Sequence, residues 1–408
     1  MADLADATRG AGAHASDPAN TCYLIHDGSY VQSGATLPFY VRQGGVSATA
    51  RRLFIGQSRA GVVIQGRGTI DTGISHVLVS NMTFTLTGYS QSGSFNTFTV
   101  LDGTDVVLDH MTFTGDCATG STGGAVEVDG TTGFVLQSSL VEKFGHCASG
   151  GHLDHGVYIS SGNGIAISNN EIRLNSSRGI QLNTEDGSFG TIDNVTITGN
   201  RIHGNGHADY EDGIVLNGGG AGTIAHVTIQ NNLIYGNYYS GIRVVDVAYA
   251  TIVISQNTLS GNGVAAAGPG KSEMNIDSFG CGANTNVTRN IISAGYQVLN
   301  DCYDALSRKY ALVGNVVQGA APTGEAGNCI SQSVVAAPMF VNAVAADFHT
   351  QNAAVAAYGA YASSTSAPSA VVPALGLPAS FALGLLLCVA GMRRFSTAEV
   401  RSAGARIG

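Results

Sequence analysis

The chain contains no tryptophan, and only 12% of its 408 residues are charged. It has no Lys/Arg-rich tract, and its formal net charge of −9 argues against nucleic acid, whose binding needs a basic surface. No Cys-x-x-Cys pair and no Cys/His spacing suggests zinc. Good helix formers are scarce, whereas Val, Ile, Thr, Asn and Gly recur in short alternating runs that are typical of strands and tight turns. The composition therefore predicts an almost entirely β protein.

A pattern of strand, polar corner and apolar residue recurs along the chain, as in VLVSNMTF, IAISNNEI and VTIQNNLI, with copies 25 to 33 residues apart. A repeat this short cannot enclose a core by itself, so it must stack on its neighbours. Short strands stack as a parallel β-solenoid whose coils are about 4.8 Å apart. We expect the aligned residues to occupy one corner, where Asn tolerates a left-handed backbone and its amides hydrogen-bond from coil to coil. The nine aligned residues are Asn81, His110, Ser139, Asn170, Asn200, Asn232, Asn257, Asn290 and Asn315.

Three segments extend this interpretation to a known family. The openings YLIHDGSYVQSG and RRLFIGQSRAGVVIQGRGTID and the closing APMFVNAVAADFHTQ resemble the right-handed parallel β-helix proteins, which include pectate lyases, alginate lyases and mannuronan C5-epimerases. The resemblance covers residues 20–360 and implies an all-β, single-stranded right-handed parallel β-helix, a solenoid that hosts many chemistries. Residues 1–19 are expected to be disordered.

The C-terminal end differs in composition from the repeats. Residues 361–373 are linker-like, and residues 374–392 carry no charge and are followed by Arg393 and Arg394. A span of this length predicts a transmembrane helix, with residues 393–408 as basic stop and tail. The tail also resembles bacterial C-terminal sorting signals of the PEP-CTERM type, with Val-Pro-Ala-Leu in place of Pro-Glu-Pro. We expect a protein anchored in the cell envelope or at the cell surface, with its N-terminal signal peptide missing from this chain.

Cysteine spacing favours export. Cys117 and Cys147 follow equivalent repeat positions by seven and eight residues, so we expect them on neighbouring coils within disulfide reach. Cys302 could pair with Cys281 or with Cys329, and Cys22 has no obvious partner.

The strands that follow the corner carry the polar residues of interest. They read GAVEVDG, HGVYISS, RGIQLNT, DGIVLNG and SGIRVVD in five successive coils. Alternation turns apolar residues such as Val157 and Ile159 into the core. The outward column is then Glu127, Tyr158, Gln181, Val215 and Arg243, and the residues before the glycines are His155, Arg178, Asp212 and Ser240. This stripe predicts a polysaccharide-binding face.

The stripe contains the groups needed to remove the C5 proton of a uronic acid. Arg178 would neutralise the substrate carboxylate, His155 would act as the base, and Tyr158 would donate a proton. This trio resembles the His, Arg and Tyr of alginate lyases and C5-epimerases. The epimerases carry Asp-Pro-His-Asp where this chain has His152-Leu153-Asp154-His155, which puts epimerase identity in doubt. The expected substrate-binding residues are Glu127, Gln181, Asp212, Arg243 and His152.

Two other classes of function remain open. A glycoside hydrolase would need paired carboxylates, and Asp186, Glu211 and Asp212 form an acidic rim that could serve this purpose or bind calcium. A non-catalytic carbohydrate-binding or adhesive surface protein would need only the stripe and the membrane anchor. Calcium is the one cofactor for which the sequence offers candidate ligands.

Overall fold

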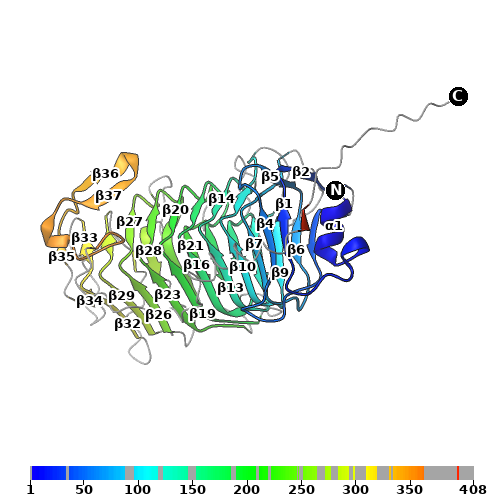
Figure 1. Ribbon diagram of the computed structural model, residues 1–408. Helices are drawn as coiled ribbons and strands as arrows, with labels where there is room; N and C mark the ends of the chain where they lie inside the picture. The colour runs from blue at the N-terminus through cyan, green and yellow to red at the C-terminus, as the bar shows by residue number, and fades with distance from the viewer. Residues whose placement is uncertain are drawn as a thin grey trace.

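Three parallel sheets run the length of the molecule and form a right-handed solenoid. Each coil contributes one strand to each sheet in turn, and the strands stack along one axis (Figure 1). The computed structural model describes residues 2–33, 36–87, 96–117, 123–145, 153–184, 190–207, 211–218, 222–245, 247, 251–263, 272–276, 284–293, 297–298, 309–318, 330–331, 334–362 and 393–394. The predicted parallel β-helix is therefore confirmed.

The first sheet has 14 strands. Along the axis these are β1 (Cys22–Ile25), β4 (Arg52–Gly56), β7 (Val77–Ser80), β10 (Thr104–Asp109), β13 (Thr131–Gln137), β16 (Gly162–Ser168), β19 (Thr191–Thr198), β23 (His226–Gln230), β26 (Thr251–Ser255), β29 (Asn284–Thr288), β32 (Lys309–Val313) and β34 (Ile330–Ser331), with β22 (Thr223–Ile224) beside β19 and β38 (Arg393–Arg394) beside β1.

The second and third sheets have 12 and 10 strands. The second comprises β2 (Gly28–Val31), β5 (Val62–Gln65), β8 (Thr83–Thr85), β11 (Thr112–Thr114), β14 (Leu140–Glu142), β17 (Glu171–Arg173), β20 (Arg201–His203), β24 (Leu233–Tyr235), β27 (Thr258–Ser260), β30 (Ile291–Ile292), β33 (Val316–Val317) and β35 (Val334–Val335). The third comprises β3 (Phe39–Val41), β6 (Gly68–Ile70), β9 (Phe98–Leu101), β12 (Val126–Asp129), β15 (Val157–Ile159), β18 (Ile180–Asn183), β21 (Ile214–Asn217), β25 (Ser240–Val245), β28 (Ser272–Ile276) and β31 (Gln297–Val298).

The interior of the solenoid is filled by apolar residues at alternate strand positions. Val157 and Ile159 are fully buried, as predicted, and so are their neighbours in the next coil, Ile180 and Leu182. Aromatic rings fill the N-terminal coils, where Phe84 packs edge-on against Phe98 at 5.1 Å between centroids. Because each inward side chain lies directly over its counterpart in the next coil, the core is one continuous column.

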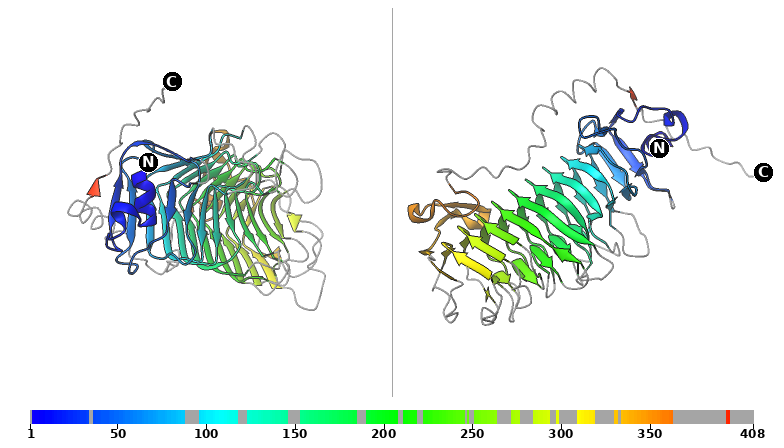
Figure 2. Two further views of the ribbon diagram at one scale, coloured as in Figure 1. Left: turned by 90° about the vertical axis from the view of Figure 1, so that its right-hand side faces the viewer. Right: turned by 90° about the horizontal axis from the view of Figure 1, so that it is seen from below.

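A helix covers the N-terminal end of the solenoid, and a β-hairpin packs beside its C-terminal coils (Figures 1 and 2). At the N-terminal end the helix α1 (Ala2–Arg9) packs beside β3, and the Arg42 amide donates to the Thr8 carbonyl at 3.0 Å. The 3₁₀ turn η1 (Gly12–His14) follows, and the His14 ring lies edge-on to Tyr23 of β1. Leu4 and Ala7 are buried there. The expectation of a disordered N-terminus is therefore wrong, because this short helix buries an apolar face that the first coil would otherwise expose.

At the other end lie the antiparallel strands β36 (Phe340–Asn342) and β37 (Asp347–Thr350), joined by the 3₁₀ turn η3 (Ala343–Ala345) and followed by η4 (Ala353–Val355). Phe348 of β37 is buried against Tyr235 of the second sheet, with ring centroids 5.0 Å apart. The hairpin thus covers the outer face of the second sheet near β24.

The predicted Asn column forms a buried ladder between the first and second sheets. The Nδ2 of each Asn from Asn170 to Asn290 donates to the Oδ1 of the next, at 2.9 to 3.0 Å, and Asn315 ends the series. The amide stacking is confirmed for these six residues, and Asn200, Asn232 and Asn257 are neighbours as expected.

Two details of the column prediction are wrong. The left-handed residue at each corner precedes the ladder position, as in Asn169 (φ 56°) before Asn170. Strand register also places His110 beside Ser138, so Asn81 and His110 are left-handed corner residues, and Met82 and Met111 take the inward positions. The physical reason is that one residue turns the backbone while the next points its side chain inward.

We predict that Asn232→Ala lowers the free energy of unfolding by about 3 kcal/mol, because buried amide and carbonyl groups lose their partners. Asn232 Oδ1 accepts from the Asn200 backbone at 2.9 Å, and Asn232 Nδ2 donates to the Ile197 carbonyl at 2.8 Å. The matched control is Asn231→Gly at the adjacent left-handed position (φ 56°), which should leave stability unchanged or raise it. Denaturant unfolding checks both, and equal losses in the two variants would contradict the prediction.

Cys22 and Cys117 each take part in a disulfide. Cys147, the predicted partner of Cys117, lies outside the described residues, as do Cys281, Cys302 and Cys329, so these pairings stay predictions. No helix in the described part of the chain is long and apolar enough to cross a membrane. The predicted span 374–392 lies outside that part, whereas Arg393 and Arg394 form β38 beside β1.

Candidate functional site

The outward column predicted from the sequence is present on the third sheet. Parallel pairing places Glu127 beside Tyr158, Tyr158 beside Gln181, Gln181 beside Val215, and Val215 beside Arg243. Beyond the predicted stretch the column continues to Asn275 at one end. The register therefore matches the prediction for all five residues.

The residues before the glycines also line up in successive coils. Backbone hydrogen bonds link Gly156 to Arg178 at 2.9 Å, Gly179 to Asp212 at 3.0 Å and Gly213 to Ser240 at 2.8 Å. These corners require glycine, because a Cβ on Gly156 would lie 2.6 Å from the backbone oxygen of Gly179. The close approach of the coils thus holds His155, Arg178 and Asp212 side by side, with about 10 Å between the first and the last.

His155 and Tyr158 form a pair at the start of β15. Their rings stack with centroids 5.3 Å apart and an interplanar angle of 21°. The Tyr158 hydroxyl accepts a hydrogen bond from Asn183 Nδ2 at 3.0 Å, and Asn183 Oδ1 in turn accepts one from Asn217 at 3.0 Å. The side-chain amides of Asn183 and Asn217, from the next two coils, therefore orient the phenol of Tyr158. The sequence had not indicated this function for the two asparagines.

Arg178 and Arg243 flank a buried carboxylate. Arg243 Nη1 lies 3.6 Å from Asp212 Oδ2, and Arg178 Nη1 donates to Gln181 Oε1 at 2.9 Å. Asp212 is fully buried, and loss of solvent raises its pKa to about 6 even though the charges of Arg243 and Arg178 act in the opposite direction. Arg243 also lies over the Tyr239 ring, 5.6 Å from its centroid. The two guanidiniums create a positive field around a carboxylate that titrates near neutral pH.

Most of the stripe is more buried than an open solvent-facing surface would be. His155 is 4% exposed, Gln181 3% and Val215 1%, whereas Tyr158 and Arg178 are half-buried. Each outward side chain has a neighbour about 4.8 Å away on both sides, so the long side chains cover the short ones. The Arg243 side chain is also mostly buried, at 11% exposure, so the site presents Tyr158 and Arg178 above a buried layer that includes His155 and Gln181.

The remaining predicted residues divide into three groups. Glu127 accepts a hydrogen bond from Asn96 at 2.8 Å beside Tyr158. Asp154 is buried and accepts from the Gly123 amide at 2.6 Å and from the Ser176 hydroxyl at 3.3 Å, so it holds a turn. His152 and Asp186 lie outside the described residues.

The described residues do not fit calcium. Within the described ranges, no group of three or more His, Cys, Asp or Glu could hold a metal ion. Asp212 faces the Arg243 guanidinium, and Glu211 accepts a hydrogen bond from the His207 backbone amide. Both candidate ligands are thus engaged with cationic or N–H groups.

A cavity of about 550 Å³ lies at the N-terminal end of the same outward column. Its lining includes Tyr40, Arg42, Thr69 and Arg9, and the Arg42 guanidinium lies 4.8 Å from the centre of the Tyr40 ring. Tyr40 and Thr69 continue the column through Thr99 to Glu127. Tyr40 is therefore four strand spacings from Tyr158, or about 19 Å. The sequence had not indicated this cavity, because Arg9 belongs to the helix that was expected to be disordered.

Comparisons with known proteins agree with the architecture. Residues 155–305 match the family model described as right handed beta helix region. The chain thus has the fold of a right-handed parallel β-helix, and part of it matches that family model. No curated protein sequence matches it.

Two solved structures are similar in fold. One is the A-module of the mannuronan C-5 epimerase AlgE6 of Azotobacter vinelandii, with a TM-score of 0.53 and 17% identity over 82% of this chain and 95% of that one. The other is the A-module of AlgE4 from the same organism, with a TM-score of 0.51 and 16% identity over 82% and 91% of the two chains. At these identities the likeness establishes the fold alone.

Proposed function

We propose that this protein acts on a uronic-acid polysaccharide by abstracting the C5 proton of a sugar unit, as a lyase or an epimerase. The observation that carries the proposal is the arrangement on the third sheet, where His155 stacks on Tyr158 one coil away from Arg178. The two similar solved structures are modules of mannuronan C-5 epimerases, which is consistent with this substrate class.

The chemistry assigns one task to each side chain. Arg178 pairs with the carboxylate at C6 of the sugar, which allows the negative charge to spread from C5 onto that carboxylate. Neutral His155 takes the C5 proton. In a lyase the electron pair then forms the C4=C5 double bond, the C4–O bond breaks, and Tyr158 protonates the leaving oxygen. In an epimerase C5 takes a proton from the opposite face. The amide of Asn183 stabilises the phenolate that Tyr158 leaves behind.

A panel of polymannuronate, polyguluronate, polygalacturonate and polyglucuronate tests the proposal. We expect one of them to yield either the absorbance of unsaturated ends or deuterium incorporation at C5 in D₂O. Unsaturated ends identify a lyase, and exchange without them identifies an epimerase. Binding without either product would favour a non-catalytic carbohydrate-binding protein, the second candidate function, with which the burial of His155 is consistent. Hydrolysis without unsaturated ends would favour a glycoside hydrolase.

Arg178→Lys should lower kcat/KM by about tenfold or more, because lysine keeps the charge but loses the two-pronged contact with a carboxylate. Arg178 is only half-buried, so the thermal midpoint should not change. Steady-state kinetics on the active polymer, with a melting curve for each variant, check the result. Unchanged kinetics would remove Arg178 from the site.

We also propose that the protein is exported to the cell envelope. The pairing of Arg393 and Arg394 with β1 does not fit a basic stop on the far side of a membrane, so the proposal does not include the predicted anchor at residues 374–392. The disulfides of Cys22 and Cys117 support export, because disulfides persist mainly in oxidising compartments. Cleavage of the solenoid by protease added to intact cells would support this location, and complete protection in cells with an opened outer layer would contradict it.

A further inference from the structure

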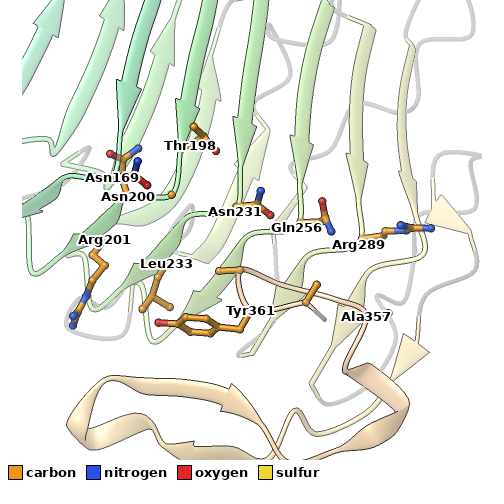
Figure 3. Close-up of a pocket in the computed structure, with 13 residues that line it drawn as sticks. Asn169, Thr198, Asn200, Arg201, Asn231, Leu233, Gln256, Arg289, Ala357 and Tyr361 are labelled. Carbon is orange, nitrogen blue, oxygen red and sulfur yellow. The ribbon is translucent and has the colours of Figure 1, made fainter. Parts of the chain in front are cut away.

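A second polar cavity lies at the corner between the first and second sheets (Figure 3). Its volume is about 490 Å³. The floor consists of corner residues from successive coils, Arg201 of β20 forms a wall, and residues 357–362 form the roof. The corner joins the first sheet to the second, so in each coil a whole strand lies between this corner and the third sheet on either side. The cavity is therefore distinct from the candidate C5 site.

The floor side chains project outward because each belongs to the left-handed residue before a ladder asparagine. Asn231, Gln256 and Arg289 have φ values of 56°, 54° and 57°. Glycine occupies the equivalent position at Gly199 and Gly314, where φ is 67° and 63°. Glycine can thus form this corner without a side chain. Gln256 and Arg289 instead adopt a left-handed backbone conformation, which is unfavourable for residues other than glycine. The corner geometry alone does not explain these two residues.

The lining carries two guanidiniums and no carboxylate. Arg201 Nη2 donates to the Tyr235 hydroxyl at 3.3 Å, which fixes its position. The Arg289 side chain is exposed and makes no hydrogen bond or ion pair with any residue in the described ranges. Arg201 and Arg289 lie three coils apart, about 14 Å, and Figure 3 shows their side chains pointing in opposite directions. The cavity therefore has one positive charge at each end, and that of Arg289 is uncompensated.

The roof is already fastened to the corner. The Gly359 amide donates to the Arg289 carbonyl at 2.9 Å, and the Ala360 amide donates to Thr258 Oγ1 at 3.0 Å. Tyr361 stacks on His349 with ring centroids 3.9 Å apart, yet it remains 40% exposed. The cavity is therefore preformed, with an aromatic ring at its mouth.

We propose that this corner cavity binds a short run of acidic sugar units, as a second polysaccharide site that performs no chemistry. The guanidiniums of Arg201 and Arg289, about 14 Å apart, each match the carboxylate of a different sugar unit. The amides of Asn231 and Gln256 suit hydroxyl groups, and Tyr361 offers a face to the apolar side of a sugar ring. The proposal goes beyond the C5 chemistry, because a chain with two sites holds two segments of polymer and gains avidity without new contacts at either site.

Arg289→Gly in the full chain is the sharpest test. It removes the guanidinium and relieves the left-handed backbone, so the thermal midpoint should stay the same or rise. The variant should bind a defined oligomannuronate in calorimetry with one site fewer than the wild type, or with a Kd about tenfold or more higher at that site. Lys143→Gly is the matched control, because Lys143 is also an exposed cation with a left-handed backbone (φ 62°), on another part of the surface. It should bind like the wild type.

The other outcomes of this experiment decide the interpretation. Unchanged binding in Arg289→Gly, or an equal loss in Lys143→Gly, would overturn the proposal. Equal occupancy by inorganic sulfate or by a neutral oligosaccharide of the same length would overturn it too, because the site would then not select an acidic sugar. A wild type with a single site that Arg289→Gly removes would support the corner site while contradicting sugar binding at the third sheet.

Discussion

Replacing His155 by alanine is expected to lower kcat on a uronic-acid polymer by about 10² to 10⁴-fold, the usual contribution of a general base. Polymer binding should persist, because it depends on the whole outward column from Glu127 to Arg243, whereas proton removal depends on one imidazole. Single-turnover kinetics and a binding isotherm on the same preparation separate the two effects.

The burial of His155 requires a control for packing. At 4% exposure, truncation to alanine opens a space beside Tyr158, and a loss of activity could then follow from a displaced phenol. His155→Phe keeps an aromatic ring in the stack and removes the proton acceptor, so it should be as inactive as His155→Ala with a smaller loss of stability. An active His155→Phe variant, or a His155→Ala variant that only unfolds more readily, would make the histidine a scaffold residue and leave the carbohydrate-binding function in its place.

The fold could be predicted from the sequence because each coil of a solenoid needs the same kinds of residue at the same positions. Alternation placed Val157 and Ile159 in the core, and the spacing of Asn170 to Asn315 placed the ladder at one corner. The register failed at Asn81 and His110, where no inward Asn marks the position and methionine fills it instead. A polar ladder can thus be predicted from the sequence where the same residue recurs in each coil. Where an apolar residue replaces it, the sequence no longer indicates which residue points inward.

A second ladder was also visible in the sequence and was missed. Asn175, Asn205, Asn237 and Asn262 each follow a first-ladder Asn by five residues, and their amides hydrogen-bond in series at 2.8 to 3.0 Å. Glu273 ends the series by accepting from Asn262 at 2.5 Å, and burial raises its pKa to about 7. This second ladder holds the corner that leads into the third sheet, so it positions the residues of the candidate site.

The site itself was only partly predictable. The outward column and the row of residues before the glycines could be predicted, because both follow from aligning the repeats along the sequence. Burial depends on which side chains cover which, and the sequence could not show that Gln181 and Asp212 lie beneath the arginines. The position of α1, which brings Arg9 to the far end of the column, depends on tertiary packing that an eight-residue segment does not reveal.

Asp212→Asn is expected to stabilise the protein at neutral and alkaline pH. Burial raises the pKa of Asp212 from 3.8 to about 6, so the folded state favours the protonated carboxyl. The stability that this group contributes is complete below pH 4 and is lost as the pH rises through 6. The rise in pKa corresponds to about 3 kcal/mol at pH 8. Asparagine remains neutral at every pH and should not incur this loss.

Unfolding free energies of the wild type and of Asp212→Asn at pH 4, 6 and 8 test this expectation. The difference between the two proteins should move by about 3 kcal/mol in favour of the variant between pH 4 and pH 8, so the pH 4 pair is the internal control. A constant difference would show that Arg243, 3.6 Å away, already compensates the buried charge. A more stable variant with weaker polymer binding or turnover would show that a destabilising carboxylate is kept between Arg178 and Arg243 because the site needs it to position the two guanidiniums.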